Sequence, residues 1–302
     1  MAPGGYAWWY VDALSDDGRH GLTLIAFVGS VFSPYYAWAR RRGPGDPHNH
    51  CALNVALYGA AGKRWTMTER GRASLRRTTS QLTIGPSCLS WDGSGLTVEI
   101  DETTAPLPSR IRGTVRLYPA ALASRRYTLD ARGGHVWQPI APCARVEVAL
   151  ERPALRWSGP GYFDTNAGDE PLEDGFASWD WSRASLGRDT AVLYDVIRRG
   201  GDRLALASRF DPAGGVVDFI APPPARLPDT LWRVTRGTRT DPGLPATVRQ
   251  TLEDAPFYAR SIVSAHLLGE SVEAVHESLS LVRFAQPWVQ LLLPFRMPRR
   301  AR

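Results

Sequence analysis

The sequence predicts a mainly β protein built from antiparallel sheets, with few helices and no parallel α/β core. Short apolar segments alternate with polar residues, which is the pattern of half-buried strands. Of the 302 residues, 28 are Gly and 24 are Pro, and these residues separate the segments in the way that turns do. Because 43% of the residues are hydrophobic, the chain can also build a sizeable core.

The first half of the chain is a succession of expected strands. The aromatic segment 6–14 is β-prone, an acidic turn containing Gly18 follows, and the apolar run 22–32 predicts a buried strand with a bend or bulge at Gly29. Further strands are expected at 50–58, 65–70, 80–84, 88–91, 96–100, 111–118 and 144–150.

The second half repeats the rhythm of the first. A strand at 179–181, a turn at 186–189 and a strand at 190–197 are similar to the opening hairpin. A further hairpin is expected over 259–281, with its turn at 268–271. This internal similarity predicts two β domains of related build, residues 1–155 and 156–302.

The net charge of +6 makes nucleic-acid binding the first alternative to consider. No basic helix, zinc-finger spacing or RNA-binding aromatic motif supports it, so we expect no nucleic-acid partner. Almost all of the positive charge is arginine, and much of it lies in clusters at 40–42, 76–77 and 299–302. Such clusters suit anionic lipid better.

Cysteine and histidine usage indicates neither a disulfide framework nor a metal site. Cys51, Cys88 and Cys143 are odd in number and widely spaced, which fits a reducing compartment. His48 and His50 have no third ligand nearby, so we expect no metal. The sequence also lacks a Gly-rich phosphate loop and a G-x-S-x-G elbow, and no signal peptide or apolar run long enough to span a bilayer is expected.

The segment 134–181 carries the candidate site. Its patterns His135-Val136-Trp137 and Tyr162-Phe163-Asp164 place two side chains each on one face of a strand. If both strands face one cavity, a carboxyl group, an imidazole, an indole and a phenol meet there. Considered singly, Asp164 after a Gly-Pro-Gly turn is more often a turn residue, and a His beside a Trp is more often part of a wall.

Longer segments resemble a known family. GYAWWYVDALSDDG, DPHNHCALNVALYG, GHVWQP, WSGPGYFDTNAGDEPLEDGF, LEDAPFYARS, VHESLSLVRF and LLPFRMPRR are similar to the carotenoid 1,2-hydratases, also named hydroxyneurosporene synthases. The resemblance runs over nearly the whole chain. It implies two antiparallel lipocalin-like β-barrel or β-sandwich domains with a cavity at or between them.

The resemblance also implies an activity and a site. The expected reaction is cofactor-independent addition of water to the C1=C2 bond of an acyclic carotenoid, in a purple-bacterial pathway. The positions that match the family are His135, Trp137, Tyr162 and Asp164. A polyene cyclase or pericyclase and a non-catalytic carrier of a long apolar ligand stay open as alternatives on the same fold.

The chemistry of the reaction suggests roles for these four residues. An alkene is a very weak base, so a strong proton donor is needed, and a carboxyl group buried among aromatic residues can stay protonated near pH 7. We therefore expect Asp164 to be the acid and the rings of Trp137 and Tyr162 to stabilise the cation. His135 is expected either to orient Asp164 or to accept the proton that the added water loses.

The C-terminal segment Trp288–Arg302 combines aromatic, leucine and arginine residues. This composition suits an interfacial contact with a membrane, and equally a segment docked on its own domain with a solvated basic end. Because the substrate dissolves in lipid, we expect a cytoplasmic protein peripherally associated with the inner photosynthetic membrane.

Overall fold

The computed structural model describes residues 1–60 and 62–300. The chain divides into two compact units. The first unit comprises residues 1–171 together with 291–302, and the second comprises residues 172–290.

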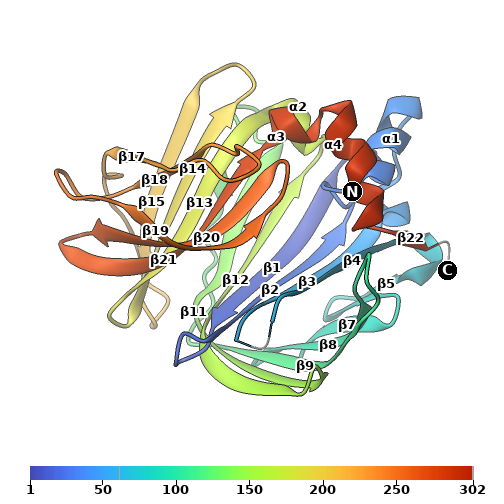
Figure 1. The fold of residues 1–302 in the computed structure, drawn as a ribbon, viewed down its shortest axis with the longest axis horizontal. Helices are drawn as coiled ribbons and strands as arrows, with labels where there is room; N and C mark the ends of the chain where they lie inside the picture. Colours follow the sequence, from blue (N-terminus) through green and yellow to red (C-terminus); the bar gives the residue numbers. More distant parts are fainter. Residues whose placement is uncertain (61, 301–302) are drawn as a thin grey trace. The chain divides into compact units, whose positions relative to one another are not determined.

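The first unit is built on one long, strongly curved sheet (Figure 1). Its pairs are antiparallel, except for the short parallel pair between β22 and β4. In order across the sheet, its strands are β22 (Arg299–Arg300), β4 (Arg64–Arg70), β3 (Cys51–Gly59), β2 (His20–Val28), β1 (Tyr6–Leu14), β12 (Leu155–Gly168), β11 (His135–Arg152), β9 (Arg110–Pro119), β8 (Leu96–Thr103), β7 (Ser87–Trp91), β6 (Gln81–Ile84) and β5 (Leu75–Arg77), with β10 (Tyr127–Thr128) paired to β11.

The curvature brings β4 against β8, which are not neighbours in the sheet. Arg70 Nη2 donates to Glu102 Oε2 at 2.7 Å, and Thr66 Oγ1 donates to the Thr103 carbonyl at 2.7 Å. Apolar side chains of the inner face fill the space that the curved sheet encloses. This core includes Val11, Leu24, Leu53, Val55, Val98, Val115, Val146 and Phe163.

A helix rather than a continued strand follows β2. Gly29 was expected to bend a strand running to residue 32, but β2 ends at Val28 and Gly29 adopts φ +69°. A side chain at Gly29 would meet the Gly5 carbonyl oxygen at 2.4 Å, so only glycine fits the close approach. Ser33 then caps α1 (Pro34–Arg42) by accepting the backbone N–H groups of Tyr35 and Tyr36.

The second unit contains a smaller antiparallel sheet, a separate two-stranded hairpin and short helices. The sheet order is β16 (Val216–Asp218), β15 (Arg203–Phe210), β14 (Asp189–Arg198), β13 (Phe176–Leu186), β21 (Glu270–Ser280), β20 (Tyr258–Leu267) and β19 (Thr247–Asp254). The hairpin is β17 (Pro224–Leu227) with β18 (Arg236–Arg239). The helices are α2 (Leu172–Gly175) and α3 (Leu281–Phe284), and α4 (Pro287–Leu292) begins in this unit.

The prediction of a mainly β, antiparallel fold is confirmed. The two units do not coincide with the expected ranges 1–155 and 156–302, because β12 pairs along its length with β1 and β11 and so belongs to the first unit. The segments expected as strands at 135–137 and 144–150 are parts of one strand, β11, whose register shifts between Pro139 and Ala144. Proline lacks the N–H that a regular ladder needs, which accounts for the irregularity.

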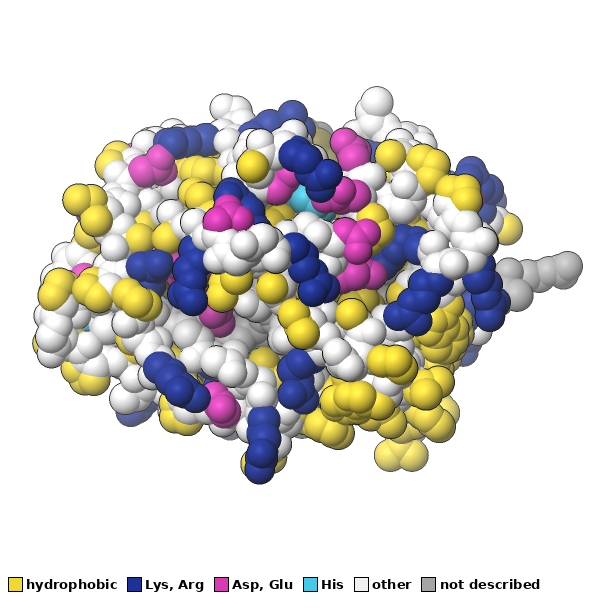
Figure 2. Space-filling view, turned by 90° about the horizontal axis from the view of Figure 1, so that it is seen from above, with side chains coloured by type: hydrophobic (Ala, Val, Ile, Leu, Met, Phe, Trp, Pro, Cys, Tyr) yellow, Lys and Arg dark blue, Asp and Glu magenta, His cyan; other side chains and the backbone are white. Residues whose placement is uncertain are grey.

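No helix within residues 1–60 or 62–300 has the length and hydrophobicity that a membrane span requires. On the face shown in Figure 2, the basic side chains lie scattered among hydrophobic and acidic ones. A nucleic-acid groove is typically lined by a continuous basic stripe, and the described residues of this face show none.

Candidate active site

Three of the four candidate residues form one hydrogen-bonded group. The Trp137 indole N–H and the Tyr162 hydroxyl both donate to Asp164 Oδ2, at 2.8 and 2.9 Å. Tyr162 and Asp164 lie two residues apart on β12. Trp137, on β11, pairs with Asn166, which is two residues beyond Asp164 on β12. All three side chains therefore share one face of the sheet. All three are buried, with Asp164 only 4% exposed.

The Tyr162 hydroxyl keeps its proton in this environment. Burial and the nearby Asp164 carboxylate raise the pKa of Tyr162 well above its ordinary value. Tyr162 is therefore a hydrogen-bond donor to Asp164 throughout the physiological pH range.

Aromatic rings surround the group. The Tyr127 ring lies 4.9 Å from the Trp137 ring, and the Tyr10 ring meets the Tyr162 ring edge to face at 6.2 Å. These rings belong to β10, β11, β1 and β12, which are neighbours in the sheet. A cation formed beside them would meet several electron-rich π faces.

His135 lies apart from Asp164. It pairs with Gly168, whereas Asp164 pairs with Pro139, four residues further along β11 and thus about 13 Å away along the strand. Its ring contacts Tyr6 through Nδ1 at 2.8 Å and Glu170 through Nε2 at 3.2 Å. The structure therefore joins Trp137, Tyr162 and Asp164 directly, and places the buried His135 in a neighbouring hydrogen-bonded group.

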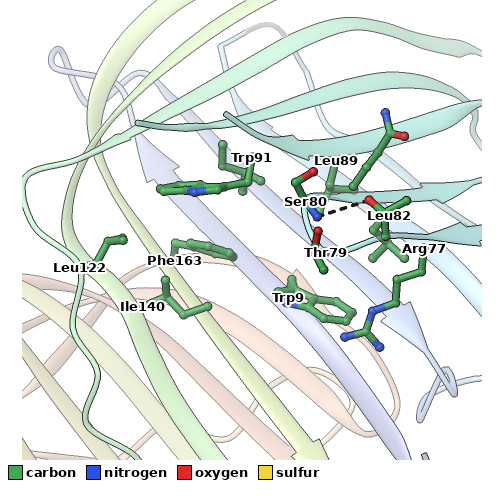
Figure 3. Close-up of a pocket in the computed structure, with 13 residues that line it drawn as sticks. Trp9, Arg77, Thr79, Ser80, Leu82, Leu89, Trp91, Leu122, Ile140 and Phe163 are labelled. Carbon is green, nitrogen blue, oxygen red and sulfur yellow. Dashed lines mark hydrogen bonds between the residues drawn. The ribbon is translucent and has the colours of Figure 1, made fainter. Parts of the chain in front are cut away.

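A pocket of about 280 Å³ lies on the opposite face of the same sheet (Figure 3). Phe163 lines it, and because side chains alternate along a strand, the flanking Tyr162 and Asp164 point the other way. Trp9 and Trp91 form further walls, and the Arg77 guanidinium lies 5.0 Å from the Trp9 ring. None of the four candidate residues lines this pocket, so it is not the cavity that the sequence analysis expected them to share.

Sequence reasoning missed a second carboxylate beside Asp164. Asp12 on β1 is fully buried and accepts a hydrogen bond from Tyr10 at 3.1 Å. The available signal was a repeated pattern, because Tyr10-Val11-Asp12 has the same Tyr-x-Asp spacing as Tyr162-Phe163-Asp164.

The second unit also contains a buried polar group that the sequence did not reveal. Ser278 donates to Asp180, and His276 Nε2 lies 3.1 Å from the Ser278 hydroxyl. Burial raises the pKa of Asp180 to about 7. Burial, with the charge of Arg236, lowers the pKa of His276 to about 3, so its imidazole stays neutral at physiological pH.

Comparison with known proteins places the chain. The family model described as carotenoid hydratase CrtC matches residues 24–302. The chain belongs to the carotenoid hydratase family. The resemblance inferred from the sequence segments is thereby confirmed.

Two curated relatives in this family carry the same name, acyclic carotenoid 1,2-hydratase. The protein from Thiocapsa roseopersicina is 63% identical over 300 residues, covering 99% of this chain and 74% of its own length. The protein from Rubrivivax gelatinosus is 59% identical over 307 residues, covering 100% of this chain and 75% of its own length.

A solved structure supports the fold of this carotenoid hydratase family member. The crystal structure of a putative AttH from Nitrosomonas europaea aligns with a TM-score of 0.60, covering 91% of this chain and 92% of that one. At 16% identity, this likeness concerns the fold alone.

Proposed function

We propose that this protein is an acyclic carotenoid 1,2-hydratase, which adds water across the C1=C2 bond to give a tertiary 1-hydroxy carotenoid. The observation that carries the proposal is the 63% identity, over 99% of the chain, to a relative of that name. The arrangement around Asp164 supports it, because a buried carboxyl group with aromatic neighbours suits acid catalysis through a cation.

Asp164 is the proton donor in this proposal. It gives its proton to C2, and the positive charge develops at the tertiary carbon C1. Since Oδ2 accepts the hydrogen bonds from Trp137 and Tyr162, we place the acidic proton on Oδ1. Both bonds strengthen as the carboxylate forms, because hydrogen bonds to a charged acceptor are stronger than those to a neutral one. They therefore stabilise the carboxylate that remains once the proton has passed to C2.

The rings around Asp164 stabilise the cation. Trp137 and Tyr162 were expected in this role, and Tyr127 extends the aromatic wall because its ring lies against that of Trp137. A desolvated cation over such faces gains about 2 kcal/mol or more. The steps require only an acid, a base and water, so we expect activity without an added cofactor.

The pocket in Figure 3 is not proposed to hold the polyene. Its volume of about 280 Å³ is just below the ~300–1,000 Å³ of sites that hold drug-sized molecules, and an acyclic carotenoid is larger than such molecules. We place the reacting end of the substrate on the Asp164 face of the sheet instead.

In the decisive experiment, the purified protein is incubated with an acyclic carotenoid and the mass of the product is measured by mass spectrometry. A hydratase gives a mass gain of one water. A cyclase or pericyclase gives an isomer of unchanged mass, and a carrier returns the substrate, so either of these results would contradict the proposal.

We further propose that the C-terminal segment contacts the membrane surface. Leu291, Leu292 and Phe295 are 64%, 42% and 70% exposed, whereas Leu293 and Met297 are buried and fix the segment to its unit. Exposed apolar side chains suit the boundary between headgroups and acyl chains, where the substrate is dissolved. Of the arginines that follow, Arg299 binds Glu69 of its own unit, whereas Arg300 is exposed. In this proposal the protein associates peripherally with a membrane through these exposed side chains.

A further inference from the structure

Two Tyr-x-Asp pairs lie side by side on neighbouring antiparallel strands. In the register of β1 with β12, Tyr10 pairs with Asp164 and Asp12 pairs with Tyr162. Within each strand the tyrosine donates to its own aspartate, at 3.1 Å for Asp12 and 2.9 Å for Asp164. The four side chains therefore form a square on one face of the sheet, with the two carboxyl groups on a diagonal.

The diagonal spacing suits an acid and a base that share one water. Diagonal neighbours on adjacent strands have Cα atoms roughly 7–8 Å apart. Inverting glycosidases, which also use one carboxylic acid and one carboxylate base with a water between them, hold the two carboxyl groups about 6.5–9.5 Å apart. The Cα spacing of Asp12 and Asp164 is compatible with such a separation of their carboxyl groups. The charge of Asp12 acts on the same group of side chains, because it also contributes to the raised pKa of Tyr162.

We propose that Asp12 is the catalytic base of the hydration, binding the added water and taking its proton while Asp164 protonates the alkene. This inference rests on the proposed function. The Asp164 O–H bond breaks as the C2–H bond forms, the water oxygen bonds to C1, and one of the water protons passes to the Asp12 carboxylate. Asp12 then carries a proton and Asp164 is ionised, so transfer of one proton from Asp12 to Asp164 restores the starting state.

Position favours Asp12 over His135 as the base. Asp12 lies one strand and two residues from Asp164, whereas His135 lies about 13 Å away along the strand direction. The ring nitrogens of His135 are also engaged, with Tyr6 and Glu170. We therefore assign His135 a structural role: its contacts with Tyr6 and Glu170 hold the end of the sheet at which it lies.

The test separates cation formation from water capture by running the reaction in D₂O. After Asp164 delivers a deuteron, C2 of the cation carries one hydrogen and one deuterium. If no base takes the proton from water, the cation reverts to alkene by returning one of these two atoms to Asp164. Return of the hydrogen leaves deuterium at C2 of the recovered substrate. We therefore expect Asp12→Asn to lose hydration by at least ~100-fold, within the range for general base catalysis, while still exchanging deuterium. Asp164→Asn should do neither, and His135→Gln should not show exchange without hydration.

Three results would overturn the assignment of Asp12. They are hydration by Asp12→Asn near the parent rate, loss of both hydration and exchange in folded Asp12→Asn, and exchange without hydration in His135→Gln. If the parent protein does not hydrate the carotenoid, the proposed function fails first, so the two failures are distinguishable.

Two further variants guard against a folding defect, since Asp12 is fully buried. Asp12→Glu keeps a carboxylate and should recover part of the hydration. Tyr10→Phe keeps Asp12 but removes its hydrogen bond, and should raise the ratio of exchange to hydration. If Asp12→Asn does not fold, an unchanged ratio in Tyr10→Phe overturns the assignment.

Discussion

Trp137 donates its indole N–H to Asp164 Oδ2 at 2.8 Å from the neighbouring strand, so one side chain offers both a hydrogen bond and an aromatic face. The two contributions can be separated. Trp137→Phe keeps a ring and removes the donor, and it should reduce kcat about 10- to 100-fold, the effect of losing a hydrogen bond to a charged group. Trp137→Ala should be slower still without abolishing hydration.

Trp9→Phe is the matched control for these variants, because Trp9 lies on the opposite face of the sheet, in the pocket of Figure 3. It should retain the parent rate. Equal rates for Trp137→Phe and Trp137→Ala would show that the ring face contributes nothing to the cation.

The exposed apolar side chains of the C-terminal segment should determine binding to lipid. Replacing Leu291, Leu292 and Phe295 together with Ser leaves the buried Leu293 and Met297 in place, which truncation of the segment would not. We expect this triple variant to co-sediment several-fold less with anionic liposomes than the parent. Leu107→Ser, at a position 83% exposed elsewhere in the same unit, is the control. Equal sedimentation by parent and triple variant would exclude the segment as the contact.

The stability of the protein should depend on pH through Asp180. Its folded-state pKa of about 7 is raised from 3.8, so the folded state holds a proton that the unfolded state releases. The contribution of Asp180 is fully present below about pH 4 and is lost as the pH rises through 7. Asp180→Asn removes this dependence. The difference in free energy of unfolding, variant minus parent, should therefore be larger at pH 8 than at pH 5 by about 2 kcal/mol.

Urea unfolding of both proteins at pH 5 and pH 8 measures this difference. His276 titrates in the opposite sense, because its pKa is lowered to about 3 and its contribution is lost as the pH falls below 6.5. Because His276 Nε2 lies 3.7 Å from Asp180 Oδ1, the same pair of proteins is also compared in a His276→Gln background, where this titration is absent. A difference that is the same at both pH values would contradict the assignment.

Much of the fold follows from local sequence signals. The strand Tyr6–Leu14 has the predicted bounds, and the turn of the last hairpin falls at Leu268 and Gly269, which both have positive φ. Local signals failed where tertiary pairing decided the outcome. Residues 135–137 and 144–150 were expected as two strands, but pairing with β12 and β9 holds them in the single strand β11.

The candidate site was predictable in part. Alternation along single strands placed Tyr162 with Asp164 and His135 with Trp137, and the structure keeps each pair on one face. Spacing within one strand does not give the register between strands, and that register separates His135 from Asp164. It also brings Asp12 beside Tyr162 from a segment about 150 residues away in the sequence.

The most direct test of the account is the rate of hydration by Asp164→Asn, measured by product mass spectrometry with an acyclic carotenoid. The amide keeps the size of the side chain and an oxygen that accepts from Trp137 and Tyr162, so circular dichroism and the melting temperature should stay close to those of the parent. It has no acidic proton, so the product heavier by one water should disappear. Hydration by the folded variant near the parent rate would contradict the assignment of Asp164 as the proton donor.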